Sequence, residues 1–127
     1  MVISIASQKG GTGKTTTTIN LGSALSKLGK KVLLLDLDPQ SNLSYSLAVT
    51  NPDATLADAF LGNKALKDIL VERNGLWIAP GSNELVDIEI SLVAQENRDV
   101  FLKTMLQELK GFDYILIDCP PSLSVLT

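Results

Sequence analysis

The sequence contains no histidine and only one cysteine, Cys119, among its 127 residues. These absences exclude histidine-based catalytic triads, zinc sites with histidine ligands, an internal disulfide framework, and a metal site built from several cysteines of one chain. No run of about 18 apolar residues is present, so no membrane-spanning helix is predicted. A net charge of −3 argues against a strongly basic nucleic-acid-binding domain. The opening residues also lack the basic start and long apolar run of a signal peptide, so we expect a cytoplasmic protein.

The residues that are present predict one α/β domain covering residues 1–127. Short apolar runs at residues 2–6, 32–35, 76–79 and 114–117 have the continuous pattern of strands buried on both faces of a parallel sheet. Helical patterns lie between them, at residues 14–28, 55–61 and around 100–109, with weaker ones at 43–47, 65–71 and 84–92. Strands that alternate with helices indicate a doubly wound, mainly parallel sheet flanked by helices.

A glycine-rich segment joins the first predicted strand to the first predicted helix, and it reads Lys9-Gly10-Gly11-Thr12-Gly13-Lys14-Thr15-Thr16. Glycines allow backbone N–H groups to turn inward around phosphates, and the positive end of the helix dipole adds to that attraction. In such a loop Lys14 contacts the β- and γ-phosphates of a nucleotide, and the Thr15 hydroxyl binds Mg²⁺. A simple glycine-rich turn with a helix cap is the alternative, and the strand–loop–helix context argues against it.

Three aspartates follow apolar strands. Asp36 and Asp38 come after the second predicted strand, and Asp118 ends the last one. Ligand sites of doubly wound sheets lie at the carboxyl ends of strands, so these three carboxylates are expected to converge on the glycine-rich segment. Asp118 is typical of a Walker B residue that holds Mg²⁺. Each aspartate alone would be interpreted as a loop or cap residue, and Asp36 has the weakest case for function.

The segment with an extra early lysine, Lys9, resembles the deviant Walker A motif of the ParA/MinD group of ATPases. The resemblance implies that Lys9 crosses a nucleotide-sandwich dimer to the partner's phosphates, whereas a solvated loop lysine is the alternative. It also implies that Asp38 positions the attacking water and that Asp36 supports the metal. Lys9, Lys14 and Asp38 would then carry catalysis. Gly10, Gly11, Thr12, Gly13, Lys14, Thr15 and Thr16 would bind nucleotide, and Thr15, Asp36 and Asp118 would serve the metal.

Two further segments indicate which branch of this group the sequence resembles. Asp-Leu-Asp-Pro-Gln-Ser-Asn at 36–42 and Ile-Asp-Cys-Pro-Pro-Ser-Leu at 117–123 are typical of ParA/Soj partitioning proteins. The family implies ATP and Mg²⁺ as cofactors, a homodimer formed on ATP binding, and a ParB-like centromere-binding partner. It also implies nonspecific DNA binding by the full-length protein, no membrane contact, and a nucleoid-associated location.

Members of that family are about twice as long, so the fold is expected to be truncated at the C-terminus. Two alternatives stay open at this stage. The chain could be a non-catalytic or weakly nucleotide-binding interaction module, or it could be a MinD-like membrane-positioning ATPase.

Overall fold

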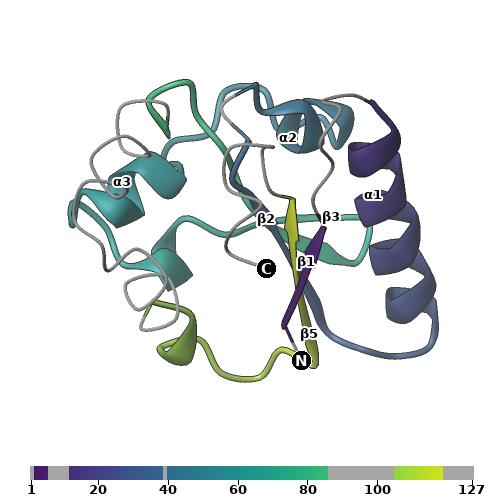
Figure 1. Ribbon diagram of the computed structural model, residues 1–127. Helices are drawn as coiled ribbons and strands as arrows, with labels where there is room; N and C mark the ends of the chain where they lie inside the picture. Colours follow the sequence, from purple (N-terminus) through teal and green to yellow (C-terminus); the bar gives the residue numbers. More distant parts are fainter. Residues whose placement is uncertain (1, 6–11, 39, 86–104, 119–127) are drawn as a thin grey trace.

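Five strands form a single sheet in the order β1-β5-β2-β4-β3 in the computed structural model, which describes residues 2–5, 12–38, 40–85 and 105–118 (Figure 1). The strands are β1 (Val2–Ile5), β2 (Val32–Asp36), β3 (Val71–Arg73), β4 (Leu76–Ala79) and β5 (Tyr114–Asp118). The helices are α1 (Thr12–Lys27), α2 (Asn42–Ser46) and α3 (Leu56–Phe60), with one 3₁₀ turn at Leu66–Asp68.

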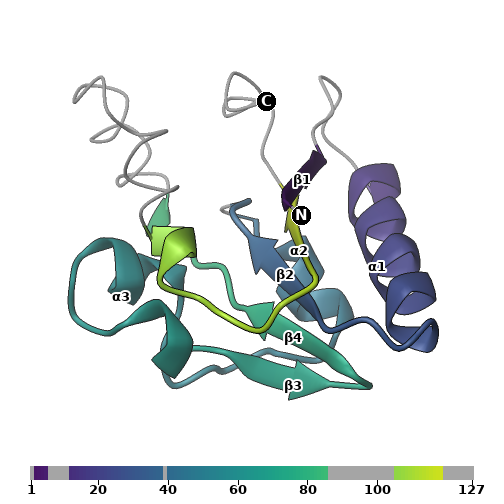
Figure 2. The ribbon, with the colours of Figure 1, turned by 90° about the horizontal axis from the view of Figure 1, so that it is seen from below.

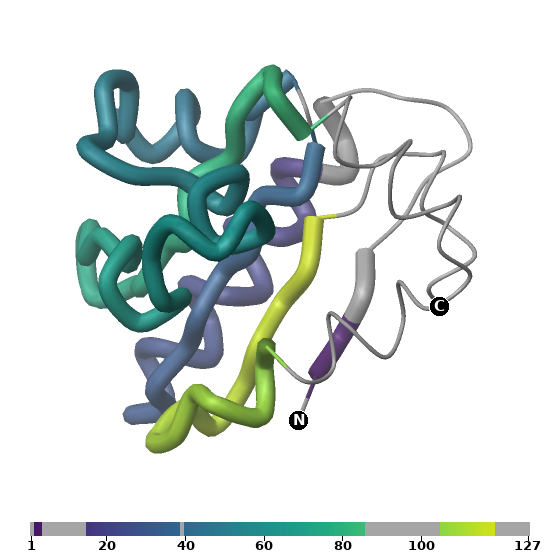
Figure 3. The backbone as a smooth tube through the Cα atoms, turned by 90° about the vertical axis from the view of Figure 1, so that its left-hand side faces the viewer, coloured from purple at the N-terminus to yellow at the C-terminus, as the bar shows by residue number. Residues whose placement is uncertain are grey.

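The sheet is parallel except at one edge. β1 pairs with β5, β5 with β2, and β2 with β4, all in parallel, whereas β3 pairs with β4 in antiparallel orientation. Figure 3 shows β1 lying alongside β5. The predicted fold class, a mainly parallel sheet flanked by helices, is therefore confirmed.

Helices cover the sheet from both sides, as Figure 2 shows with α1 and α3 on opposite faces. Side chains alternate along each strand, so every second residue faces the same layer. On β2, Leu33 and Leu35 pack in one core cluster with residues of α3, whereas Val32 and Leu34 pack in the other, against α1 and α2. All of β2 is buried, which explains its uninterrupted apolar sequence.

The helix α1 ends at Lys27, one residue before the predicted end, and the predicted stop at Gly29 is confirmed. Gly29 follows it with φ +84°, a left-handed conformation that favours glycine, and the Gly29 N–H donates to the carbonyl of Ser26. The helix starts at Thr12, two residues before the predicted start. At α3 the predicted cap is confirmed, because Thr55 accepts from Ala57 N–H and Asp58 accepts from Thr55 N–H.

The prediction of a helix over residues 65–71 is wrong. Only Leu66–Asp68 forms a 3₁₀ turn, and Val71 already belongs to β3. The cause is the dipeptide Asn74-Gly75, whose φ angles of 54° and 83° make the tight turn of a β-hairpin between β3 and β4. That turn draws the preceding residues into an edge strand.

Two predicted helices fall largely outside the described residues. The segment 84–92 is described only as far as residue 85. Of the segment around 100–109, residues 105–107 are helical, and Met105, Leu106 and Leu109 pack against the core cluster on the α3 face. Gly111 ends this segment with φ +91°.

Candidate functional site

The carboxyl ends of β2 and β5 bring two aspartates together. The parallel register pairs Asp36 with Asp118, and Ile5 at the end of β1 also pairs with Asp118. The period of two along each strand places Asp36 on the same face as Leu34, and Asp118 on the same face as Leu116. This is the face covered by α1 and α2, so both carboxylates lie on the side of the sheet that these two helices cover.

Thr15 reaches across to β5 from the first turn of α1. Its hydroxyl donates to Oδ2 of Asp118 at 3.2 Å, and both side chains are buried. The two residues lie 103 positions apart in sequence, so only the tertiary fold brings them together. A hydroxyl and a carboxylate oxygen at this distance are a pair of hard oxygen donors of the kind that Mg²⁺ prefers.

Asp36 is fully buried at the end of β2, and it is held by α2. Its Oδ2 accepts from the backbone N–H of Ser44 at 2.9 Å and from the Ser44 hydroxyl at 2.5 Å. Burial raises the pKa of Asp36 from 3.8 to about 6. The hydrogen bonds from Ser44 oppose that rise, and the charges of Asp118 and Asp38 add to it.

The second oxygen of Asp36, Oδ1, is also buried, and it has no hydrogen-bond partner among the described residues. A buried carboxylate oxygen without a partner carries a free-energy cost that a cation would offset. Within the described part of the chain, no three His, Cys, Asp or Glu side chains lie close enough together to hold a metal by themselves. The oxygen donors of Thr15, Asp118 and Asp36 therefore fit Mg²⁺ that arrives with a nucleotide, whose phosphates supply further ligands.

Asp38 lies two residues beyond Asp36, in a turn that its own groups stabilise. Its Oδ1 accepts from Gln40 N–H at 2.9 Å, and its backbone carbonyl accepts from Ser41 N–H at 2.8 Å. Ser41 adopts φ 57°, and α2 begins directly after it. The turn therefore sets both the position of Asp38 and the start of α2.

The glycine-rich segment lies partly outside the described residues, which exclude Lys9, Gly10 and Gly11. The backbones of Thr12, Gly13 and Lys14 form the first turn of α1, although the described side chains begin at Thr15. Thr16 is exposed. No acidic residue occupies this first turn, so no side chain of the helix itself competes with a phosphate for the positive end of the helix dipole.

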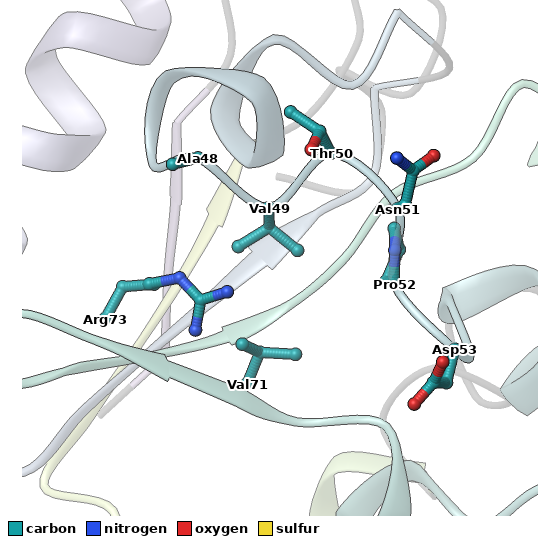
Figure 4. Close-up of a pocket in the computed structure, with 8 residues that line it drawn as sticks. All are labelled: Ala48, Val49, Thr50, Asn51, Pro52, Asp53, Val71 and Arg73. Atoms are coloured by element: carbon teal, nitrogen blue, oxygen red, sulfur yellow. The ribbon is translucent and has the colours of Figure 1, made fainter.

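A cavity of about 410 Å³ opens beside Thr15 between α1 and α2, lined by Thr16, Asn42 and Tyr45 among others. A second cavity, of about 390 Å³, is lined by residues 48–53 with Val71 and Arg73 (Figure 4). It shares no lining residue with the first, and it contains none of the predicted site residues. The cavity beside Thr15 therefore belongs to the candidate site, and a third cavity, of about 420 Å³, reaches Ser44 of α2.

Two residues of this site were missed in the sequence. Ser44 donates twice to Asp36, and Gly81 N–H donates to the Ser44 hydroxyl at 3.0 Å. Ser44 does carry a weak signal, because it is a polar residue next to Leu43 on the buried side of a short helix. Gly81 gives none beyond its place after the strand that ends at Ala79.

Comparison with known proteins places this chain in a family. The family model AAA_31, described as an AAA domain, matches residues 1–127. The chromosome partitioning protein ParA of Caulobacter vibrioides is 44% identical over 99% of this chain and 50% of its own length. The sporulation initiation inhibitor protein Soj of Bacillus subtilis is 42% identical over 99% of this chain and 52% of its own.

A solved structure of a related protein has the same fold as this chain. Cobyrinic acid a,c-diamide synthase from Mycobacterium smegmatis, with bound ATP analog and magnesium, superposes with a TM-score of 0.89 at 40% identity. The match covers 98% of this chain and 53% of that protein. This chain thus spans about half the length of the relatives it matches. Among the described residues, no helix is long and apolar enough to cross a membrane.

Proposed function

This chain belongs to the AAA_31 family and is of the ParA/Soj type, and from that premise we propose that it binds and hydrolyses Mg-ATP in a partitioning system. The observation that carries the proposal is the contact between the Thr15 hydroxyl and the Asp118 carboxylate, 3.2 Å apart at the start of α1. It supplies hard oxygen donors directly after a glycine-rich segment.

The roles that we propose for the site residues combine the chemistry of a phosphate-binding loop with what the ParA/Soj family implies for Asp36, Asp38 and Lys9. Lys14 and the backbone of residues 10–16 bind the phosphates, and Thr15 with Asp118 holds Mg²⁺, which neutralises phosphate charge. Asp36 supports this metal environment through its buried carboxylate. Asp38 orients the attacking water, and Lys9 supplies positive charge to the nucleotide of a second subunit, where transition-state charge accumulates. In this proposal the protein catalyses hydrolysis by positioning the nucleotide and water and by stabilising the charge of the transition state, with no covalent intermediate.

The wider activity belongs to the same proposal. ATP binding joins two subunits face to face, the complete protein binds DNA nonspecifically at the nucleoid, and a ParB-like partner stimulates hydrolysis and release. The relatives named as ParA and Soj proteins support this assignment. With a net charge of −3, this chain offers little general attraction to DNA, so we assign the DNA contacts to a local basic surface of the complete protein.

The test is a titration of Mg-ATP with paired lysine variants. Lys14→Ala should weaken Mg-ATP binding at least tenfold, because it removes a charge-assisted contact to phosphate. Lys27→Ala, an exposed lysine at the other end of the same helix, should leave the affinity unchanged. Equal affinities in the two variants would rule out the phosphate site.

Catalysis and pairing need separate measurements on the complete natural chain. Asp38→Ala should bind Mg-ATP normally and abolish turnover, and Lys9→Ala should remain monomeric with ATP in analytical ultracentrifugation. Tight Mg-ATP binding with no turnover in the unmodified protein would support the interaction module instead.

A further inference from the structure

Ser44 is the point where three segments meet. Its backbone N–H and its hydroxyl both donate to Oδ2 of Asp36 at the end of β2, at 2.9 and 2.5 Å. The same hydroxyl accepts from Gly81 N–H, at 3.0 Å, in the segment after β4. Ser44 itself belongs to α2 and is 3% exposed. One side chain therefore joins the ends of two strands to a helix.

The Asp36 carboxylate accepts a hydrogen bond from the first turn of α2, where a side-chain N-cap is missing. The residue before α2, Ser41, makes no side-chain cap hydrogen bond, so the first N–H groups of the helix need another acceptor. Asp36 supplies it to Ser44 from eight residues earlier in the chain. The residues between Asp36 and Ser44 consequently form a segment whose two ends are hydrogen-bonded to each other, and Asp38 lies within it.

The contacts among Asp36, Ser44 and Gly81 form a junction, and Gly81 supplies its third member. A Cβ atom at position 81 would lie 2.7 Å from the backbone oxygen of Asp36 and 3.1 Å from its Oδ2. The Gly81 backbone is therefore in direct contact with Asp36, and only a residue without a side chain fits there. The Ser44 hydroxyl bridges the two by donating to one and accepting from the other.

The geometry points to Ser44 as a positioning residue for the proposed ATP hydrolysis: its hydroxyl fastens the segment that carries Asp38 to Asp36 and to Gly81. Both Ser44 donors go to a single oxygen of Asp36, and the other oxygen, Oδ1, is left without a partner among the described residues. A carboxylate held in this way has a fixed orientation. This inference rests on the proposed function.

The test uses Ser44→Thr and Ser44→Val, which have nearly the same shape and differ in the hydroxyl. In the complete natural chain, Ser44→Val should lower kcat for ATP about tenfold, as expected for the loss of a hydrogen bond to a charged group, with KM changed less than twofold. Ser44→Thr should retain most of kcat. Lys27→Ala, an exposed lysine in the last turn of α1, should match the unmodified protein.

A readout that needs no catalysis accompanies these rates. The amide hydrogen of Gly81 should exchange faster with solvent in Ser44→Val than in Ser44→Thr, because only threonine retains the acceptor for it. Equal exchange rates in the two variants would contradict the hydrogen bond between Gly81 N–H and the Ser44 hydroxyl. Faster exchange with an unchanged kcat would show that Ser44 is structural alone and would overturn its positioning role.

The outcomes also separate this inference from the function on which it rests. If the unmodified complete chain does not hydrolyse ATP at all, the proposed function fails, and the role of Ser44 in hydrolysis fails with it. If that chain is active and Ser44→Val is equally active, only the role of Ser44 fails.

Discussion

Replacing Asp36 with asparagine should reveal how much the buried carboxylate costs the fold. Asp36 is fully buried, and burial raises its pKa from 3.8 to about 6. Asparagine has nearly the same shape and retains a carbonyl oxygen that can accept from Ser44. The variant therefore removes the titration and preserves the acceptor.

The sign and size follow from the raised pKa. Between pH 3.8 and about 6 the folded protein retains a proton that the unfolded chain releases, so the free energy of unfolding falls as pH rises through this window. This rise of the pKa corresponds to about 3 kcal/mol, which is lost in full only well above pH 6. This contribution is present below the unfolded pKa and absent above the folded one.

Urea denaturation of both proteins at pH 4, 5, 6 and 7.5, without Mg²⁺ or nucleotide, measures this contribution. The stability of Asp36→Asn minus that of the unmodified protein should increase by about 2 kcal/mol from pH 4 to 7.5, because at pH 4 the unfolded chain has already released part of its proton. Asp53→Asn, at an exposed position, should show a small difference that does not vary with pH. A constant difference for Asp36→Asn across this range would refute the argument.

Three further substitutions test the packing of the fold by urea denaturation, one of them together with a measurement of Mg-ATP affinity. Gly81→Ala should destabilise the protein by about 1–3 kcal/mol, because its Cβ would lie 2.7 Å from a backbone oxygen of Asp36; unchanged stability would contradict that contact. Leu34→Ala, at a fully buried position on β2, should cost about 2–5 kcal/mol, whereas Leu28→Ala, 74% exposed, should stay within about 0.5 kcal/mol. Thr55→Ala should cost about 1 kcal/mol through the lost cap of α3 and leave Mg-ATP affinity unchanged, so a loss of affinity would mean that α3 supports the site.

The sequence predicted those elements whose cause is local. The continuous apolar run of β2 and the glycine after α1 are signals contained in a few neighbouring residues, and both were interpreted correctly. The hairpin at Asn74-Gly75 was also a local signal, but the apolar pattern of residues 65–71 was interpreted as a helix instead. In this segment the turn chemistry of Asn74-Gly75 outweighs the apolar periodicity.

The convergence of Asp36 and Asp118 was predictable from the sequence, because strand ends of a parallel sheet converge, which is a rule of the fold class. The hydrogen bonds that connect Asp36 to other segments were not. The bridge from Asp36 through Ser44 to Gly81 depends on where α2 and the segment after β4 settle in space. No spacing within the sequence encodes that contact, so it could only be seen in the structure.

The pairing of Asp36 with Asp118 has a consequence for folding. A shift of one residue in the parallel register would turn the side chains of one strand to the opposite face, because their period is two. The same shift would move a carboxylate into the apolar layer beneath α3 and carry leucines away from it. A register error that separates Asp36 from Asp118 therefore also disrupts the apolar packing of the core. The same burial of leucines that stabilises the fold selects the register in which the site is assembled.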